Sequence, residues 1–282
     1  MNIIKFLDEF TTENLTQKVS SRRDVFSTFG SLSKKAALAA IPFGMATTSA
    51  NAFVAQNQNA AVGALQLALT LEYLEAEFYI KALASGVIPG GSRAEKIYMQ
   101  ISKHETAHVA FLRNGLEGAG ATPVAKPTFD FTAGGMFDPF NNNNSGQAVA
   151  YAQSLALAQA FEDTGVRAYK GQAVNLMGTP FLTPALQIHS VEALHASEIR
   201  RLRARVLGEP TNQNALGWIT LNNRGPGMPA ATQAVYDGEE NVVQGGVNLV
   251  DATEFNAVAV SQSYDEPITA QTAQAIAGLF IV

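Results

Sequence analysis

The stretches HETAHV (104–109) and VEALHASEIR (191–200) decide the fold, because each carries a Glu-x-x-His pair inside a helical apolar pattern. The pairs are Glu105 with His108 and Glu192 with His195. Side chains three residues apart share one face of an α-helix, so each pair can direct a carboxylate and an imidazole to one point. Apolar residues continue the same row on both sides, which is typical of the buried face of a helix.

Helical apolar spacing recurs in four segments, at about 59–83, 92–116, 146–174 and 183–207. Glycine and proline residues separate the first from the second and the third from the fourth. The stretch from 118 to about 145 has no helical repeat. The sequence therefore predicts an all-α fold, a four-helix bundle with one long crossover between its two helix pairs.

The first and third segments each place a glutamate in the buried row. These are Glu72 in LTLEYLEAEFY (69–79) and Glu162 in FEDTGVRAYKG (161–171). When the two stretches are aligned on these glutamates, Tyr79 falls over Tyr169. We expect both hydroxyl groups to hydrogen-bond carboxylates of the site, with ordinary core packing as the alternative.

Glu75 is the alternative to Glu72 as the ligand from the first helix. It precedes Glu105 by 30 residues, the same interval that separates Glu162 from Glu192. It lacks the tyrosine partner, however, so we prefer Glu72 and expect Glu75 and Glu77 to be flanking or surface charges. We also expect solvent-facing positions for a further set of charged residues, namely Asp163, Arg200, Arg201, Arg203 and Arg205.

A carboxylate buried alone is very costly, so the four glutamates in apolar rows must be paired, protonated or bound to metal. Two Glu-x-x-His helices with one glutamate from each of two others form the ligand set of dinuclear carboxylate bundles. Four carboxylates neutralise two divalent ions, and this donor set suits iron, manganese or zinc, in that order of preference. The expected ligands are Glu72, Glu105, His108, Glu162, Glu192 and His195.

Composition narrows the possible functions of the 282 residues. The absence of cysteine excludes thiolate chemistry, iron–sulfur clusters and cysteine zinc sites. The net charge is −5, which argues against nucleic acid as a partner. With 47% hydrophobic and 15% charged residues, the chain is expected to be globular.

The N-terminus has the layout of a secretory signal peptide. SRRDVF (21–26) precedes an apolar run at 36–46 and the small residues Ala50 and Ala52. The arginine pair is similar to a twin-arginine signal, and the alternative is an ordinary amphipathic helix. We expect residues 1–52 to be removed after Ala52, leaving a periplasmic or extracellular protein without a membrane anchor.

The remaining chain divides at about residue 210. Residues 53–210 are expected to form the bundle. Residues 211–282 are rich in Asn, Gln and Gly and end in a short predicted helix at about 269–280. We expect this extension to pack on the bundle or on a partner subunit. In the second case the protein would be a homo-oligomer.

Four helix motifs and the tail motif YDEPIT (264–269) resemble the ferritin-like domain of exported bacterial proteins and plant desiccation-related proteins. The resemblance runs from about residue 60 to the C-terminus. It implies a ferritin-like four-helix bundle in which Glu105 and Glu192 are bridging or bidentate ligands. It also implies a role in stress or desiccation, by oxidation of Fe(II) or removal of peroxide, with O2 or H2O2 as the reaction partner.

Two other functions compete with this interpretation. His104 and His108 match the H-E-x-x-H motif of zinc peptidases. Against it, Phe111 stands where the extended motif needs glycine, and Val191 replaces the first histidine in the repeated copy. The second alternative is a non-enzymatic protein that stores metal or protects other molecules.

Overall fold

A computed structural model describes residues 47–209 and 216–282, with side chains from residue 59 onward. From Asn51 to Val282 the chain forms one unit. Most of the expected signal peptide and the expected boundary at residue 210 lie outside the described residues, so both stay predictions. Residues 47–52 belong to the first described helix, and nothing in the structure tests cleavage there.

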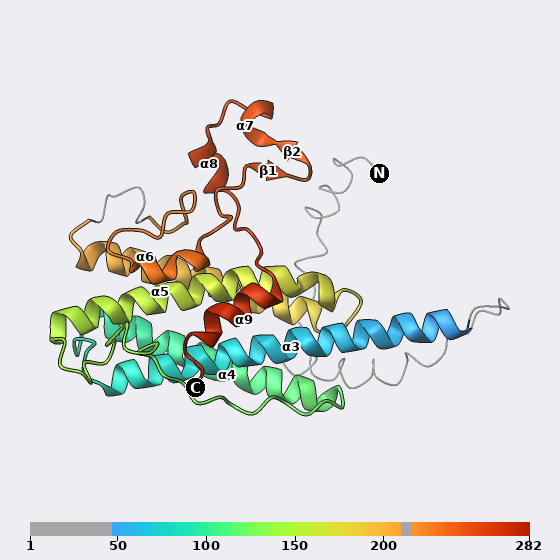
Figure 1. Ribbon diagram of the computed structural model, residues 1–282, viewed down its shortest axis with the longest axis horizontal. Coiled ribbons are helices and arrows are strands. Elements are labelled where there is room, and N and C mark those ends of the chain that lie inside the picture. Colours follow the sequence, from blue (N-terminus) through green and yellow to red (C-terminus); the bar gives the residue numbers. More distant parts are fainter. Residues whose placement is uncertain (1–46, 210–215) are drawn as a thin grey trace, which may run out of the picture. The chain divides into compact units, whose positions relative to one another are not determined.

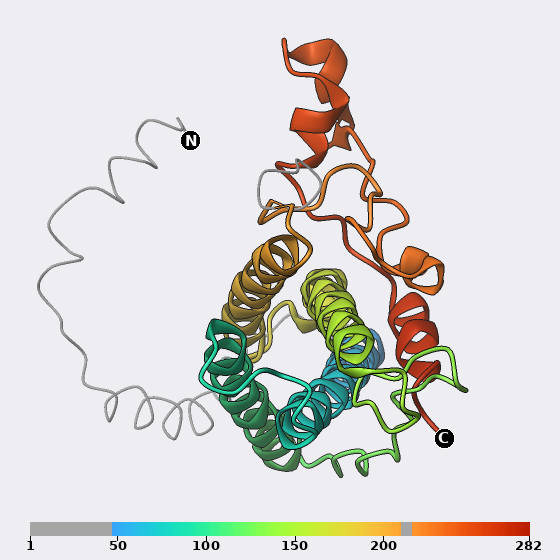
Figure 2. The same cartoon turned by 90° about the vertical axis from the view of Figure 1, so that its left-hand side faces the viewer.

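Four long helices form the bundle (Figures 1 and 2). They are α3 (Thr47–Ala84), α4 (Arg93–Gly118), α5 (Gln147–Gln172) and α6 (Leu182–Val206). The all-α prediction is confirmed, and the expected boundaries hold within about two residues, except that α3 starts at Thr47. Among the described residues, no helix combines the length and the apolar character that crossing a membrane requires.

Local sequence signals set the start of α4 after the first turn. Ser92 caps α4, because its side chain accepts a hydrogen bond from the N–H of Glu95. Gly91, directly before this cap, has a φ of 71°, a conformation that residues with a Cβ rarely adopt. The turn therefore returns α4 alongside α3 and places Glu105 opposite Glu72.

The long crossover between α4 and α5 contains no helix, as expected. Several of its phenylalanine side chains are nevertheless buried in the core. Phe131 lies 5.6 Å from Phe78 and 6.3 Å from Phe161, measured between ring centroids. The crossover also pairs with the end of the chain, where the Asp130 N–H donates to the Phe280 carbonyl at 2.8 Å. It thus closes one side of the core beside the helices that carry the acidic residues.

The C-terminal extension consists of short elements and packs on α5. They are η4 (Ala230–Val235), β1 (Val243–Gln244), β2 (Val247–Asn248), α7 (Leu249–Ala252), α8 (Ala257–Ser261) and α9 (Ala270–Gly278). A further short helix, η2 (Ala173–Leu176), follows α5 directly. The predicted final helix is α9, capped by Thr269 and packed against α5 (Figure 1). Gly171 permits this contact, because a Cβ there would lie 2.0 Å from the Ile268 carbonyl oxygen.

The extension also changes the environment of charges that were expected to face solvent. Arg201 and Arg205 are exposed, but the expectation is wrong for Asp163, Arg200 and Arg203, which are at most 4% exposed. The helical period correctly places these three away from the acidic interior. Their burial comes from residues of the extension, such as Tyr236, whose hydroxyl donates to Asp163 at 2.7 Å.

Candidate metal centre

Five carboxylates from four helices meet inside the bundle. The residues are Glu72 and Glu75 from α3, Glu105 from α4, Glu162 from α5 and Glu192 from α6. None is more than 3% exposed. Such a concentration of acidic groups away from water requires bound cations or bound protons.

The six expected ligands form two groups that share members. In one, Glu72 and His108 lie with Glu105 and Glu192, and in the other the same two glutamates lie with Glu162 and His195. Within each group, one donor atom per residue lies within 4.8 Å of all the others. Two adjacent ions would therefore share Glu105 and Glu192, the two residues expected to bridge.

The histidine distances fit donors arranged around a common ion. His108 Nδ1 lies 2.9 Å from Glu105 Oε2, 3.2 Å from Glu72 Oε2 and 3.3 Å from Glu192 Oε1. A single ring N–H cannot donate well to three carboxylates at once. Donors bound at about 2.1 Å and at right angles are about 3 Å apart, so the spacing is that of neighbouring ligands.

The second histidine repeats this arrangement. His195 Nδ1 lies 2.9 Å from Glu105 Oε1 and 3.2 Å from Glu162 Oε2. Both rings thus turn the same nitrogen toward the shared carboxylates. The pseudo-repeat seen in the sequence is therefore present as a repeat of side-chain geometry.

Unsatisfied carboxylate oxygens test whether this donor set fits metal ions. Within the described chain, Glu105 Oε1 and both oxygens of Glu192 are buried without a well-aligned hydrogen bond, although His195 Nδ1 lies 2.9 Å from the first and His108 Nδ1 lies 3.3 Å from Glu192 Oε1. Buried polar atoms without partners are uncommon, and here they belong to the two shared residues. Carboxylates with imidazoles suit iron, manganese or zinc, so the residues fit a pair of such ions.

The two tyrosines orient carboxylates of opposite helices, as the sequence predicts. The Tyr79 hydroxyl on α3 donates to Glu162 Oε1 on α5 at 2.5 Å. The Tyr169 hydroxyl on α5 donates to Glu72 Oε1 on α3 at 2.6 Å. Each of these glutamates is thereby left with its second oxygen facing a histidine.

Glu75 was expected to be a flanking or surface charge, and this expectation is wrong. It is 3% exposed, and the charges of Glu192 and Glu162 act on it. Gly165 on α5 leaves the space, because a Cβ there would lie 3.2 Å from Glu75 Oε1 and 2.9 Å from Glu192 Oε2. The signal available in the sequence was the 30-residue spacing from Glu75 to Glu105.

Glu77 lies away from the site, as expected for a flanking charge. It forms ion pairs with Lys81, at 2.6 Å, and with Lys126. Partial burial alone would raise the pKa of its carboxyl, but the hydrogen bonds and charges of Lys126 and Lys81 together lower it. Glu77 therefore stays charged on the outer side of α3.

His104 supports the second half-site and does not bind beside His108. Its Nδ1 lies 2.8 Å from His195 Nε2, the nitrogen that faces away from the carboxylates. His104 belongs to neither group of candidate ligands found among the described residues. This geometry argues against the peptidase, which would need His104 and His108 on one ion.

Burial raises the pKa of most carboxyls in the cluster. Burial and the charge of Glu105 raise the pKa of Glu72 to about 8, although His108 opposes the shift. Burial with neighbouring glutamate charges raises the pKa values of Glu75 and Glu192 well above the ordinary range, and burial raises that of Glu162. Without metal, these groups hold protons to reduce their mutual repulsion.

Glu105 and the histidines carry the compensating charge. Burial would raise the pKa of Glu105, but hydrogen bonds from His108 and His195 outweigh it and lower the pKa to about 2. Burial would lower the pKa of His195, yet Glu162 and Glu105 raise it to about 11. The pKa of His108 is raised too, by its three carboxylate neighbours. The metal-free site therefore resembles a cluster of ion pairs.

The sequence also matches a known protein family. Residues 60–205, which include all four site helices, match the family model described as a ferritin-like domain. No curated protein matches the chain.

Proposed function

We propose that this chain, which belongs to the ferritin-like domain family, binds two iron or manganese ions and uses them to oxidise Fe(II) or to remove peroxide. The observation that carries the proposal is the sharing of Glu105 and Glu192 between two groups of ligands. Shared carboxylates hold two ions close enough to act on one small oxidant. A single structural ion would not need a second, equivalent set of ligands.

The bound metals would supply electrons one at a time, so that two Fe(II) ions and two protons convert one H2O2 into two water molecules. Residues that do not bind the metals themselves hold the metal-binding carboxylates in position. The O–H groups of Tyr79 and Tyr169 fix the non-shared carboxylates. The glutamates are closed off from bulk water, while the His108 side chain is 13% exposed. The nearest approach for a small oxidant is therefore on the side of α4.

Export and a role in stress or desiccation are part of the same proposal and rest on sequence patterns. The expected signal peptide would place the metal centre outside the cytoplasm. N-terminal sequencing of the mature protein tests this point. A mature chain that begins at Met1 would contradict export by cleavage after Ala52.

Metal content per chain, measured by mass spectrometry on protein purified without chelator, is the first test of the site. We expect about two ions per chain in the wild type. Glu105→Ala and Glu192→Ala should each lose the metal and keep their helix content. Glu117→Ala is the matched control, since Glu117 is on the same helix as Glu105 but 55% exposed. Unchanged metal content in both site variants would refute the assignment.

Turnover is tested separately, with Fe(II) oxidation followed under O2 and under H2O2. The wild type and Glu117→Ala should accelerate oxidation equally, and Glu105→Ala should not. Two bound ions without acceleration by either oxidant would refute the enzymatic proposal. The non-enzymatic alternative, metal storage or protection, would then describe the protein.

A further inference from the structure

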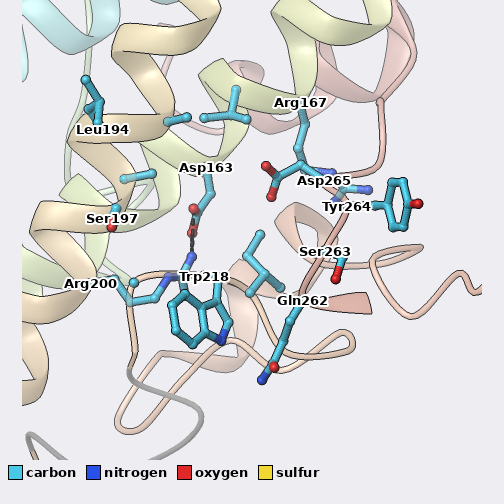
Figure 3. Close-up of a pocket in the computed structure, with 15 residues that line it drawn as sticks. Asp163, Arg167, Leu194, Ser197, Arg200, Trp218, Gln262, Ser263, Tyr264 and Asp265 are labelled. Carbon is cyan, nitrogen blue, oxygen red and sulfur yellow. Dashed lines mark hydrogen bonds and ion pairs between the residues drawn. The ribbon is translucent and has the colours of Figure 1, made fainter. Parts of the chain in front are cut away.

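A cavity of about 320 Å³ lies on the outer side of α5 and α6, away from the acidic interior (Figure 3). Its walls come from α5 and α6 and from two segments of the extension, 217–219 and 262–265. Small-molecule sites usually have volumes of about 300–1,000 Å³, so the cavity suits a ligand of about one ring. Nothing in the proposed metal chemistry uses it.

The two arginines that line the cavity are already paired with carboxylates. Arg200 reaches from α6 to Asp163 on α5, with Nη2 at 2.7 and 2.6 Å from the two carboxylate oxygens (Figure 3). Arg167 is paired with Glu239 at 2.7 Å and also donates to carbonyl groups of the extension. No surplus positive charge remains to hold an anion.

Polar groups of both kinds are nevertheless present at the wall. The Arg200 side chain is only 2% exposed, and its Nη1 has no hydrogen-bond acceptor among the described residues. The hydroxyl of Ser197 and the carboxyl of Asp265 also line the cavity. Burial and the charge of Asp163 raise the pKa of Asp265, which shifts this carboxyl toward its neutral form, able to donate as well as to accept a hydrogen bond. A ligand with several hydroxyl groups can both donate to and accept from such a set.

Trp218 provides a flat apolar surface on the side formed by the extension (Figure 3). Its side chain remains 43% exposed although it borders a cavity, and it is the one tryptophan of the chain. An indole ring offers an apolar face together with a polar N–H. The C–H face of a sugar ring is the natural complement to this combination.

We propose that the cavity binds a small uncharged carbohydrate, stacked on Trp218 and hydrogen-bonded to the polar groups around Arg200. The site is independent of the metal centre, because the lining residues face outward from α5 and α6. Ala193 and Ala196 line its floor, directly after Glu192 and His195 in the chain.

Fluorescence of Trp218 reports on the cavity directly, because no other tryptophan contributes. The full chain would be titrated with neutral monosaccharides, and with acetate, phosphate and choline as charged comparators. We expect a saturable change with a neutral sugar alone. No saturable change with any sugar, or a saturable change with the charged probes alone, would overturn the proposal.

Two variants separate binding in the cavity from general effects on the protein. Ala193→Leu fills the cavity and should weaken binding about tenfold or more, which corresponds to about 1.4 kcal/mol. Ala110→Leu makes the same change at an exposed position of α4 and should bind like the wild type. Equal affinity in both variants, with unchanged helix content, would place the sugar elsewhere and refute the assignment.

Calorimetry with Trp218→Ala gives a second measurement if Ala193→Leu does not fold. The exposed position of Trp218 makes this variant compatible with folding. Loss of the stacking surface should weaken sugar binding about tenfold. An unchanged affinity would contradict the role of Trp218 and, with it, the proposed site.

Discussion

Removal of the metal should make the stability of this protein fall as the pH rises from 6 to 8. The reason is that the folded, metal-free site holds protons that the unfolded chain releases. Burial raises the pKa of Glu72 from an ordinary 4.5 to about 8. The charge of Glu162 and a hydrogen bond with Glu105 raise the pKa of His195 from 6.5 to about 11, against the effect of burial.

These two groups give the sign and the scale of the effect, and the raised pKa values of His108, Glu75 and Glu192 act in the same direction. A group with a raised pKa in the folded state stabilises fully below its unfolded pKa, and this contribution disappears as the pH rises through the folded pKa. The window is pH 4.5 to 8 for Glu72 and pH 6.5 to 11 for His195. The pKa of Glu105 is lowered, so its opposite effect lies below pH 4.5.

Each retained proton changes the free energy of unfolding by about 1.4 kcal/mol per pH unit. Between pH 6 and pH 8, Glu72 and His195 together should therefore remove about 4 kcal/mol. Small domains have a total stability of about 5–15 kcal/mol, so the change is large enough to measure. Bound metal replaces the protons, and the loaded protein should show a much weaker dependence on pH in this range.

Urea unfolding followed by circular dichroism at pH 6, 7 and 8 provides the measurement, on metal-free and metal-loaded protein. Glu72→Gln is the control, because it removes one titrating group and should reduce the slope by up to one proton. A metal-free protein whose stability stays constant or rises from pH 6 to pH 8 would refute the reasoning. The carboxylates could then not be clustered in the way described.

Three substitutions test other parts of the structure. Gly165→Ala would place a methyl group 2.9 Å from Glu192 Oε2, and we expect a loss of about 1–3 kcal/mol and weaker metal binding, measured by unfolding and by metal titration. His104→Ala would remove the partner of His195 Nε2 and should weaken metal binding about 10- to 100-fold, without loss of helix content in circular dichroism. Tyr236→Phe would remove one of the donors to the buried Asp163 carboxylate, which keeps Arg200, and should lower the free energy of unfolding in urea by about 1–3 kcal/mol, with metal content unchanged. Wild-type behaviour in any of these assays would contradict the contact concerned.

The helices and the six candidate ligands could be predicted because helical periodicity and residue type both point to them. A glutamate within an otherwise apolar helix face indicates a functional site, because an unpaired buried carboxylate is very costly. The repeat of Glu72 and Tyr79 in Glu162 and Tyr169 supplied a second, independent signal. Together these features place each candidate ligand on a helix face from the sequence alone.

The sequence left Glu75 as the second choice to Glu72 and did not identify the role of His104, for a different reason. Their roles depend on single contacts between helices, with Gly165 in one case and His195 in the other. Periodicity locates a residue on a helix face within a broad sector, and Glu75 lies only one turn from Glu72. Which of the two enters the site therefore depends on the space left by the facing helix. The residue spacing within one helix gives no information on that space.

The burial of Arg200 shows how the C-terminal extension changes the surroundings of a contact that both helix pairs of the bundle share. In the alignment of the two halves, Tyr73 and Arg113 correspond to Asp163 and Arg200. Both arginines make the corresponding contact, since Arg113 Nη1 donates to the Tyr73 hydroxyl at 2.8 Å.

The difference between these pairs lies in what covers them. The Arg113 side chain remains 48% exposed, so in the first half of the repeat the arginine lies at the surface. In the second half, Tyr236 of the extension contacts both Asp163 and Arg200, and Trp218 lines the same cavity as this pair. A surface contact of the repeat has thereby become a buried ion pair at the wall of a cavity. The bundle places the arginine, but the extension decides whether it faces solvent or a ligand.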